Sequence, residues 1–150
     1  MGAVTYPDSR VAEFVVSRMI PVQLLFDAQP YASQYNIKWT PTMIVLDAEG
    51  KEHHRIVGFL PPDEFVPGLL LGIAKVSFDR DDLEGALPDL EKIVSSYPRS
   101  AAAPEAMYLR GVVQYKTTHK AEPLKEAFEQ LKRDYPSSEW AKRAMPYGLL

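Results

Sequence analysis

The amino-acid sequence predicts an α/β region with a small mixed sheet, followed by a region built only from helices. Three observations support this prediction. A strand–turn–strand pattern spans residues 39–59, and helix-like and strand-like segments alternate before it. From residue 79 onward every regular segment is helical, and the pattern from 90 to 103 returns from 128 to 141. The expected boundary divides the chain into residues 1–77 and 78–150.

The composition is that of an ordinary globular protein. With 150 residues, 46% hydrophobic and 25% charged, the chain can form one domain or two small ones. The formal charge of −3 provides no basic surface for nucleic acid, and the most apolar window, 65–78, is too short to span a bilayer. The N-terminal residues lack the basic and apolar regions of a signal peptide, so the default expectation is the cytoplasm. Neither nucleic acid nor a membrane is expected as a partner.

The first part of the chain contains two helix signals and one strand signal. Asp8 or Ser9 can cap a helix that runs to Arg18. Val22–Phe26 is mostly apolar and lies between a proline and an aspartate, which predicts a fully buried strand. A short helix is expected over Pro30–Tyr35, because proline is favoured in the first turn of a helix. The order up to this point is helix, strand, helix.

Next comes the strand–turn–strand pattern. Pro41 precedes the apolar and largely branched run Met43–Asp47, so a buried strand can start without losing an interior hydrogen bond of the sheet. The segment Ala48–Lys51 contains a glycine and is expected to form a hairpin turn. Arg55–Phe59 then supplies the second strand of the hairpin.

These elements together resemble the second half of the thioredoxin fold, from about Pro7 to Phe78. In that family the proline before the third core strand is cis, and the backbone beside it pairs with an extended peptide. The resemblance therefore implies a peptide-binding site at Trp39, Thr40 and Pro41. The redox motif Cys-x-x-Cys of the family is absent, because the chain contains no cysteine.

Compared with a complete thioredoxin fold, the predicted order lacks its beginning. The first core strand and the helix that carries Cys-x-x-Cys would precede Met1. In the family that strand lies between the strands matching Val22–Phe26 and Met43–Asp47, so its absence leaves two edges with unpaired backbone groups. The two strands can close up directly, or a second copy of the chain can fill the gap as a homodimer. Alternatively, Met1 lies inside a longer reading frame.

Four longer helices are predicted after the hairpin. They span 62–77, 83–96, 104–118 and 123–134, and Pro67 is expected to bend the first or to shift its start. The last helix repeats the second at an offset of 38 residues, including the Tyr-Pro pair that closes each. This pattern resembles tetratricopeptide repeats (TPR). The sequence thus predicts an incomplete thioredoxin-like mixed sheet followed by an α-helical TPR-like hairpin that packs on it.

Aromatic residues of the helical tail form a second set of candidate binding residues. Tyr108 and Tyr115 are seven residues apart and share one helical face, and Trp140 lies further along the chain. This spacing is more typical of core packing than of a ligand groove. The concave surface of a repeat pair can nevertheless hold a partner helix or peptide. Tyr108, Tyr115 and Trp140 are therefore interpreted as candidate partner-binding residues.

Other polar clusters predict no chemistry. His53 and His54 are adjacent on a strand and should point to opposite faces, so a solvated hairpin is expected rather than a metal site. The acidic segment Asp79–Glu84 lacks the central glycine of a calcium loop and is read as a helix cap. Asp27 matches a position where the family keeps polar residues, but a proton acceptor has no thiol to deprotonate in this chain.

The first function hypothesis is a non-catalytic thioredoxin-like protein that acts as a protein or peptide interaction module. It would bind a partner segment through the Pro41 loop or the helical tail. The alternative is the C-terminal portion of a thiol–disulfide oxidoreductase whose Cys-x-x-Cys lies upstream of Met1. The resemblance implies that activity for the family, but the residues present cannot perform it, since exchange proceeds by thiolate attack. No cofactor and no metal are expected.

Overall fold

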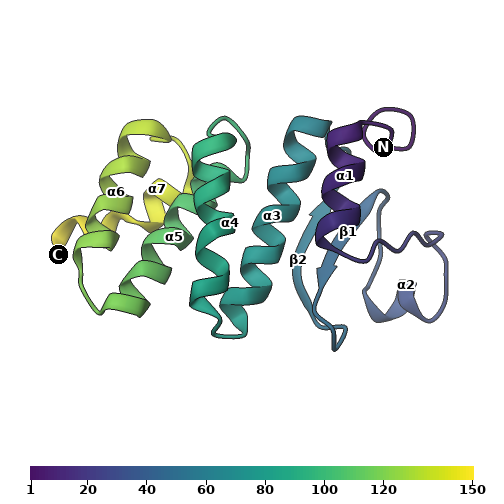
Figure 1. The fold of residues 1–150 in the computed structure, drawn as a ribbon, viewed down its shortest axis with the longest axis horizontal. Coiled ribbons are helices and arrows are strands. Elements are labelled where there is room, and N and C mark those ends of the chain that lie inside the picture. The colour runs from purple at the N-terminus through teal and green to yellow at the C-terminus, as the bar shows by residue number, and fades with distance from the viewer.

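A computed structural model describes residues 1–150, and Figure 1 shows its two ends to be built differently. The N-terminal end contains two helices and a β-hairpin, whereas the C-terminal end is purely helical. The elements in chain order are α1 (Ser9–Arg18), α2 (Tyr31–Gln34), β1 (Thr42–Leu46), β2 (Glu52–Val57), α3 (Pro62–Asp79), α4 (Leu83–Ser96), α5 (Ala103–Thr118), α6 (Glu122–Asp134), α7 (Glu139–Arg143) and the 3₁₀ turn η1 (Met145–Leu149).

Helix α1 forms as its sequence predicts. The side chain of Asp8 caps it by accepting a hydrogen bond from the backbone N–H of Arg10 at 2.9 Å. Val11 and Phe14, three residues apart on one face, are buried in the main core. The helix ends at Arg18, where the prediction placed its end.

The predicted strand Val22–Phe26 is wrong. These residues form no strand, and their apolar side chains are exposed: Val22 by 74%, Leu25 by 78% and Phe26 by 69%. The physical reason is that a strand, unlike a helix, needs a neighbouring strand for its backbone hydrogen bonds. No such neighbour lies beside this segment. The sheet therefore has two antiparallel strands instead of a larger mixed arrangement.

The β1–β2 hairpin packs one face on α3. Thr42 pairs with Val57 at the open end, and a bulge interrupts the register between Val45 and Leu46. Met43 and Val45 are partly buried against the main core. Gly72 of α3 allows this contact, because a Cβ at that position would lie 2.6 Å from Cγ2 of Val45. Helix α3 starts at Pro62 and includes Pro67, so the helix continues through that proline.

Helices α3 to α6 follow one another as neighbouring antiparallel rods (Figure 1). Asp82 caps α4 by accepting a hydrogen bond from the backbone N–H of Gly85 at 2.9 Å. Gly111 lets α5 and α6 approach closely, because a Cβ there would lie 2.6 Å from Cβ of Ala127. The predicted limits of α4, α5 and α6 agree with the structure to within one residue.

One hydrophobic core links the two ends of the molecule. Its members come from α1, α3, α4 and α5, so α3 packs against the hairpin and also against α4. A smaller cluster of Met107, Leu131, Ala141 and Ala144 joins α5, α6 and α7. The prediction that the helical tail packs on the α/β part is thereby confirmed. None of the helices is both long enough and apolar enough to cross a membrane.

Candidate binding cleft between the hairpin and the helices

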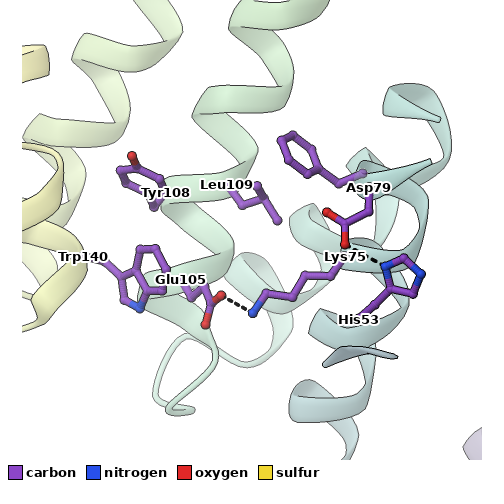
Figure 2. Close-up of a pocket in the computed structure, with 8 residues that line it drawn as sticks. His53, Lys75, Asp79, Glu105, Tyr108, Leu109 and Trp140 are labelled. Carbon is purple, nitrogen blue, oxygen red and sulfur yellow. Dashed lines mark hydrogen bonds and ion pairs between the residues drawn. The ribbon is translucent and has the colours of Figure 1, made fainter. Parts of the chain in front are cut away.

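A small cleft opens where the hairpin, α3, α5 and α7 meet (Figure 2). Its volume is about 210 Å³, which is below the ~300–1,000 Å³ typical of sites for whole small-molecule ligands. The cleft therefore has the size to receive one or two side chains. It is lined by His53 of β2, by Lys75, Phe78 and Asp79 of α3, by Glu105, Tyr108 and Leu109 of α5, and by Trp140 of α7.

Aromatic rings form one wall of the cleft. The Tyr108 ring packs against Trp140 with 5.2 Å between centroids and against Tyr147 with 5.6 Å. The hydroxyl groups of Tyr108 and Tyr147 are 2.7 Å apart and share a hydrogen bond. Burial, together with this bond, raises the pKa of Tyr147 to about 12, so the Tyr147 hydroxyl is protonated at neutral pH. The wall is thus a fixed aromatic surface that is uncharged.

The polar side of the cleft is centred on His53, and here the sequence prediction is wrong. His53 is the extra residue of the bulge in β2, and its side chain is only 1% exposed. A bulge interrupts the alternation of strand side chains and re-aims one of them. As a result His53 and His54 both contact α3, through Asp79 and Lys75 respectively. The expected solvated hairpin with divergent histidines does not form.

His53 lies between two carboxylates. Its Nδ1 is 2.6 Å from Asp79 and its Nε2 is 2.9 Å from Asp47. Since carboxylates only accept hydrogen bonds, both contacts are satisfied only when both ring nitrogens carry a proton. The hydrogen bonds that His53 donates to Asp47 and Asp79 accordingly raise the pKa of His53, and the same bond to Asp47 lowers the pKa of that carboxyl. This imidazolium fastens the hairpin turn to the C-terminal end of α3.

Lys75 links the hairpin to α5. Its Nζ forms an ion pair with Glu105, shown in Figure 2, and lies 3.4 Å from Nδ1 of His54. Burial and the nearby ammonium lower the pKa of His54 to about 4, so this histidine is neutral at pH 7. The charges that line the cleft are therefore already paired with one another. No group of His, Asp and Glu in the chain is arranged to hold a metal ion.

The predicted site residues fall at separate places. Tyr108 and Trp140 meet in the cleft, whereas Tyr115 is 41% exposed and does not line it. Trp39, Thr40 and Pro41 are also outside the cleft, at the entry to β1, and the Trp39 side chain is 69% exposed. The Thr40–Pro41 peptide bond is cis, as is the bond before Pro30.

The polar residues of the cleft escaped the sequence analysis for two reasons. The bulge that turns His53 inward has no sequence signal of its own, because strand patterns are read on the assumption that side chains alternate strictly between the two faces. The pairing of Lys75 with Glu105 depends on how α3 and α5 are placed. The repeat offset found in the sequence compared α4 with α6 and so gave no information about that pair.

The protein thus consists of a unit with a β-hairpin joined to stacked pairs of helices. Each of these two parts matches a family model. Residues 6–70 match the model of a thioredoxin-like domain, and residues 105–138 match the model of a tetratricopeptide repeat. The chain thus carries a thioredoxin-like region followed by a TPR-like repeat, as the sequence patterns predicted. No curated protein and no solved structure is significantly similar to the chain.

Proposed function

We propose that this protein is an interaction module that binds a segment of a partner protein in the cleft and catalyses no reaction itself. The observation that carries the proposal is the cleft where the TPR helices meet the thioredoxin-like hairpin. Two of the three aromatic residues expected to bind a partner, Tyr108 and Trp140, line it.

The chemistry of the cleft suits a protein segment better than a small charged ligand. Asp79 and Glu105 are each paired with a cation of the chain, so no buried charge is left to recognise an ion. Packed aromatic rings such as Tyr108 and Trp140 provide apolar contact area at low cost in side-chain entropy. An apolar or aromatic side chain of a partner fits this combination, with flanking polar groups reaching the paired charges at the rim.

A second surface of the same module is the loop that contains Pro41. The Trp39 side chain there is largely exposed and uncommitted to the core. The backbone carbonyl of Pro41 already accepts a hydrogen bond from Gly58 at 2.8 Å, so that group serves the hairpin. An extended partner segment would pair with the remaining backbone groups beside Thr40, with Trp39 packing on it.

The two tryptophans of the chain allow the surfaces to be tested separately. A Trp39→Phe chain reports only from Trp140 in the cleft, and a Trp140→Phe chain reports only from Trp39 in the loop. Peptides selected from a random library against the unmodified chain are titrated into each. We expect the emission of Trp140 to change on binding. The proposal would be contradicted if no selected peptide changed the tryptophan emission in either titration.

Two tyrosines of α5 provide matched variants for the cleft. Tyr108→Ala removes part of the aromatic wall and is expected to weaken peptide binding at least about tenfold. Tyr115→Ala removes an exposed ring outside the cleft and is expected to leave the affinity unchanged. Circular dichroism checks the fold of both. If Tyr108→Ala does not fold, Glu105→Gln, which alters the polar rim of the cleft, replaces it as the test variant.

The alternative function is that of a thiol–disulfide oxidoreductase, and the match of residues 6–70 to a thioredoxin-like domain favours it. Disulfide exchange needs a thiolate, and residues 1–150 contain no cysteine. Under this alternative the thiols belong to a segment outside residues 1–150. A chain of residues 1–150 is expected to be inactive in an insulin-reduction assay, and turnover by it would contradict the interaction-module proposal.

A further inference from the structure

The segment Val22–Phe26 has the properties of a strand that lacks a partner. Four of its five side chains are apolar, and all five residues are exposed. Only one of its backbone groups takes part in a hydrogen bond: the carbonyl of Leu25 accepts one from the backbone N–H of Ala28. Exposed apolar side chains together with free backbone donors and acceptors are the conditions under which a strand adds to a sheet.

The hairpin has two edges, and they are unequally protected. The outer edge of β2 carries the bulge and the charged residues Glu52 and Arg55, which pair with each other; charges and bulges hinder the addition of another strand. The strand β1 reads Thr-Met-Ile-Val-Leu and contains no charge. It forms backbone hydrogen bonds with β2, and none joins it to any other strand. The edge of β1 is therefore the open one.

We propose that two copies of the chain form a symmetric dimer in which Val22–Phe26 of each copy adds as a strand to the β1 edge of the other. One chain supplies both an unpartnered strand segment and an unprotected edge. Both are five residues long, since β1 spans Thr42–Leu46. In a two-fold arrangement the strand segment of each copy pairs with the β1 edge of the other, so both segments and both edges are paired. Such a dimer is self-complementary and closed. This inference is independent of the cleft.

The area available is sufficient for such a dimer. Val22, Leu24, Leu25 and Phe26 are 74%, 51%, 78% and 69% exposed. At roughly 170 Å² for a fully exposed large apolar residue, they present on the order of 500 Å² per copy, or about 1,000 Å² for two copies. The receiving edges add to this area, and specific interfaces begin at ~1,200 Å². A two-stranded sheet is also marginal by itself, so added strands stabilise it.

Sedimentation velocity of the whole chain over a wide range of concentration tests the proposal. We expect a reversible dimer. Leu24→Lys places a charge in the exchanged strand and is expected to raise the dimer dissociation constant at least about tenfold. Val16→Lys is the matched control, because Val16 is 77% exposed on α1 and outside the strand. A chain that stays monomeric, or a dimer that Leu24→Lys does not weaken, would overturn the proposal.

Cysteine cross-linking tests which strands are adjacent in the dimer. Because the chain has no native cysteine, any disulfide must join the introduced residues. A chain with Cys introduced at position 22, 24 or 26 is mixed with a chain carrying Ile44→Cys and oxidised mildly. Adjacent strands bring one such pair within disulfide distance, so a mixed-chain product is expected. A double variant, Leu24→Cys with Ile44→Cys, that links only within monomers would show closure inside one chain and overturn the exchange.

Discussion

The two ends of this molecule differ in how their backbone and side chains are satisfied. In the helical end, Leu90, Ile93, Val113 and Leu131 are completely buried. In the thioredoxin-like end, apolar residues from Ile20 to Phe26 are exposed and the sheet has only two strands. Helices close their hydrogen bonds within one segment, whereas a strand depends on a segment that can be far away or missing. The difference predicts where mutations matter.

A matched pair of isoleucines, one at each end, gives the largest expected difference in stability. Ile93 is 0% exposed in α4 and Ile20 is 92% exposed after α1. Ile93→Ala removes buried methyl groups and leaves a cavity, so it is expected to lower the free energy of unfolding by about 2–5 kcal/mol. Ile20→Ala is expected to change it by less than about 0.5 kcal/mol. Urea denaturation of both variants checks this, and equal costs would contradict the stated difference between the ends.

Two glycines lie at close contacts between elements, one in the helical end and one beside the hairpin. A Cβ on Gly111 would lie 2.6 Å from Cβ of Ala127 and 3.0 Å from the carbonyl oxygen of Pro123, neither of which can rotate away. A Cβ on Gly72 would lie 2.6 Å from Cγ2 of Val45, on the hairpin. Gly111→Ala is therefore expected to cost about 1–3 kcal/mol despite the better helix propensity of alanine.

The cost of Gly72→Ala is expected to be smaller, because the two-stranded hairpin can shift relative to α3. Gly2→Ala is the control, since nothing lies within 4 Å of the added methyl group. Thermal unfolding of the three variants ranks them. A larger loss for Gly72→Ala than for Gly111→Ala would mean that the hairpin joint is as rigid as the helical one.

The adjacent histidines of β2 predict opposite dependences of stability on pH. The pKa of His54 is lowered to about 4, so protonation favours the unfolded chain and stability falls as the pH drops from about 6.5 to 4. The pKa of His53 is raised by Asp47 and Asp79, so its contribution is complete below about 6.5 and is lost as the pH rises through the folded pKa.

His54→Gln should therefore flatten the acid side of the stability profile, and His53→Gln should flatten the side above pH 6.5. The change for His54→Gln is expected to be on the order of 1–2 kcal/mol after allowing for solvent screening. The measurement is the free energy of unfolding from urea titrations between pH 4 and 8, with the pKa values followed by NMR. If both variants change the same side of the profile, the assigned protonation states are wrong.

The sequence sufficed wherever local signals determine the structure. The cap Asp82 and the apolar spacing of α4 predicted that helix because caps, propensity and periodicity act within a few residues. The same rules predicted α1, α5 and α6. They failed at Val22–Phe26, where the apolar run indicated a strand but no neighbouring strand in the structure pairs with its backbone.

The candidate site was predictable only in part for a related reason. Helical spacing pointed to Tyr108 and Tyr115, and the aromatic content of the tail added Trp140. Of the three, Tyr108 and Trp140 line the cleft and Tyr115 does not. The bulge at His53 and the pairing of Lys75 with Glu105 depend on how separate elements pack, and no local pattern encodes them. Polar networks that join distant elements are thus difficult to predict from sequence alone.

Exposed ion pairs are expected to contribute least, and this excludes one explanation for the difference between the ends. Arg10 pairs with Asp63 at the thioredoxin-like end, where the side chains are 67% and 82% exposed, and Arg143 pairs with Glu139 at the helical end, where they are 57% and 64% exposed. Arg10→Gln and Arg143→Gln should each leave the free energy of unfolding nearly unchanged, because solvent screens such pairs. Urea titrations at low and high salt check this. A clear, salt-dependent loss at the helical end alone would make surface charge, and not burial, the source of its stability.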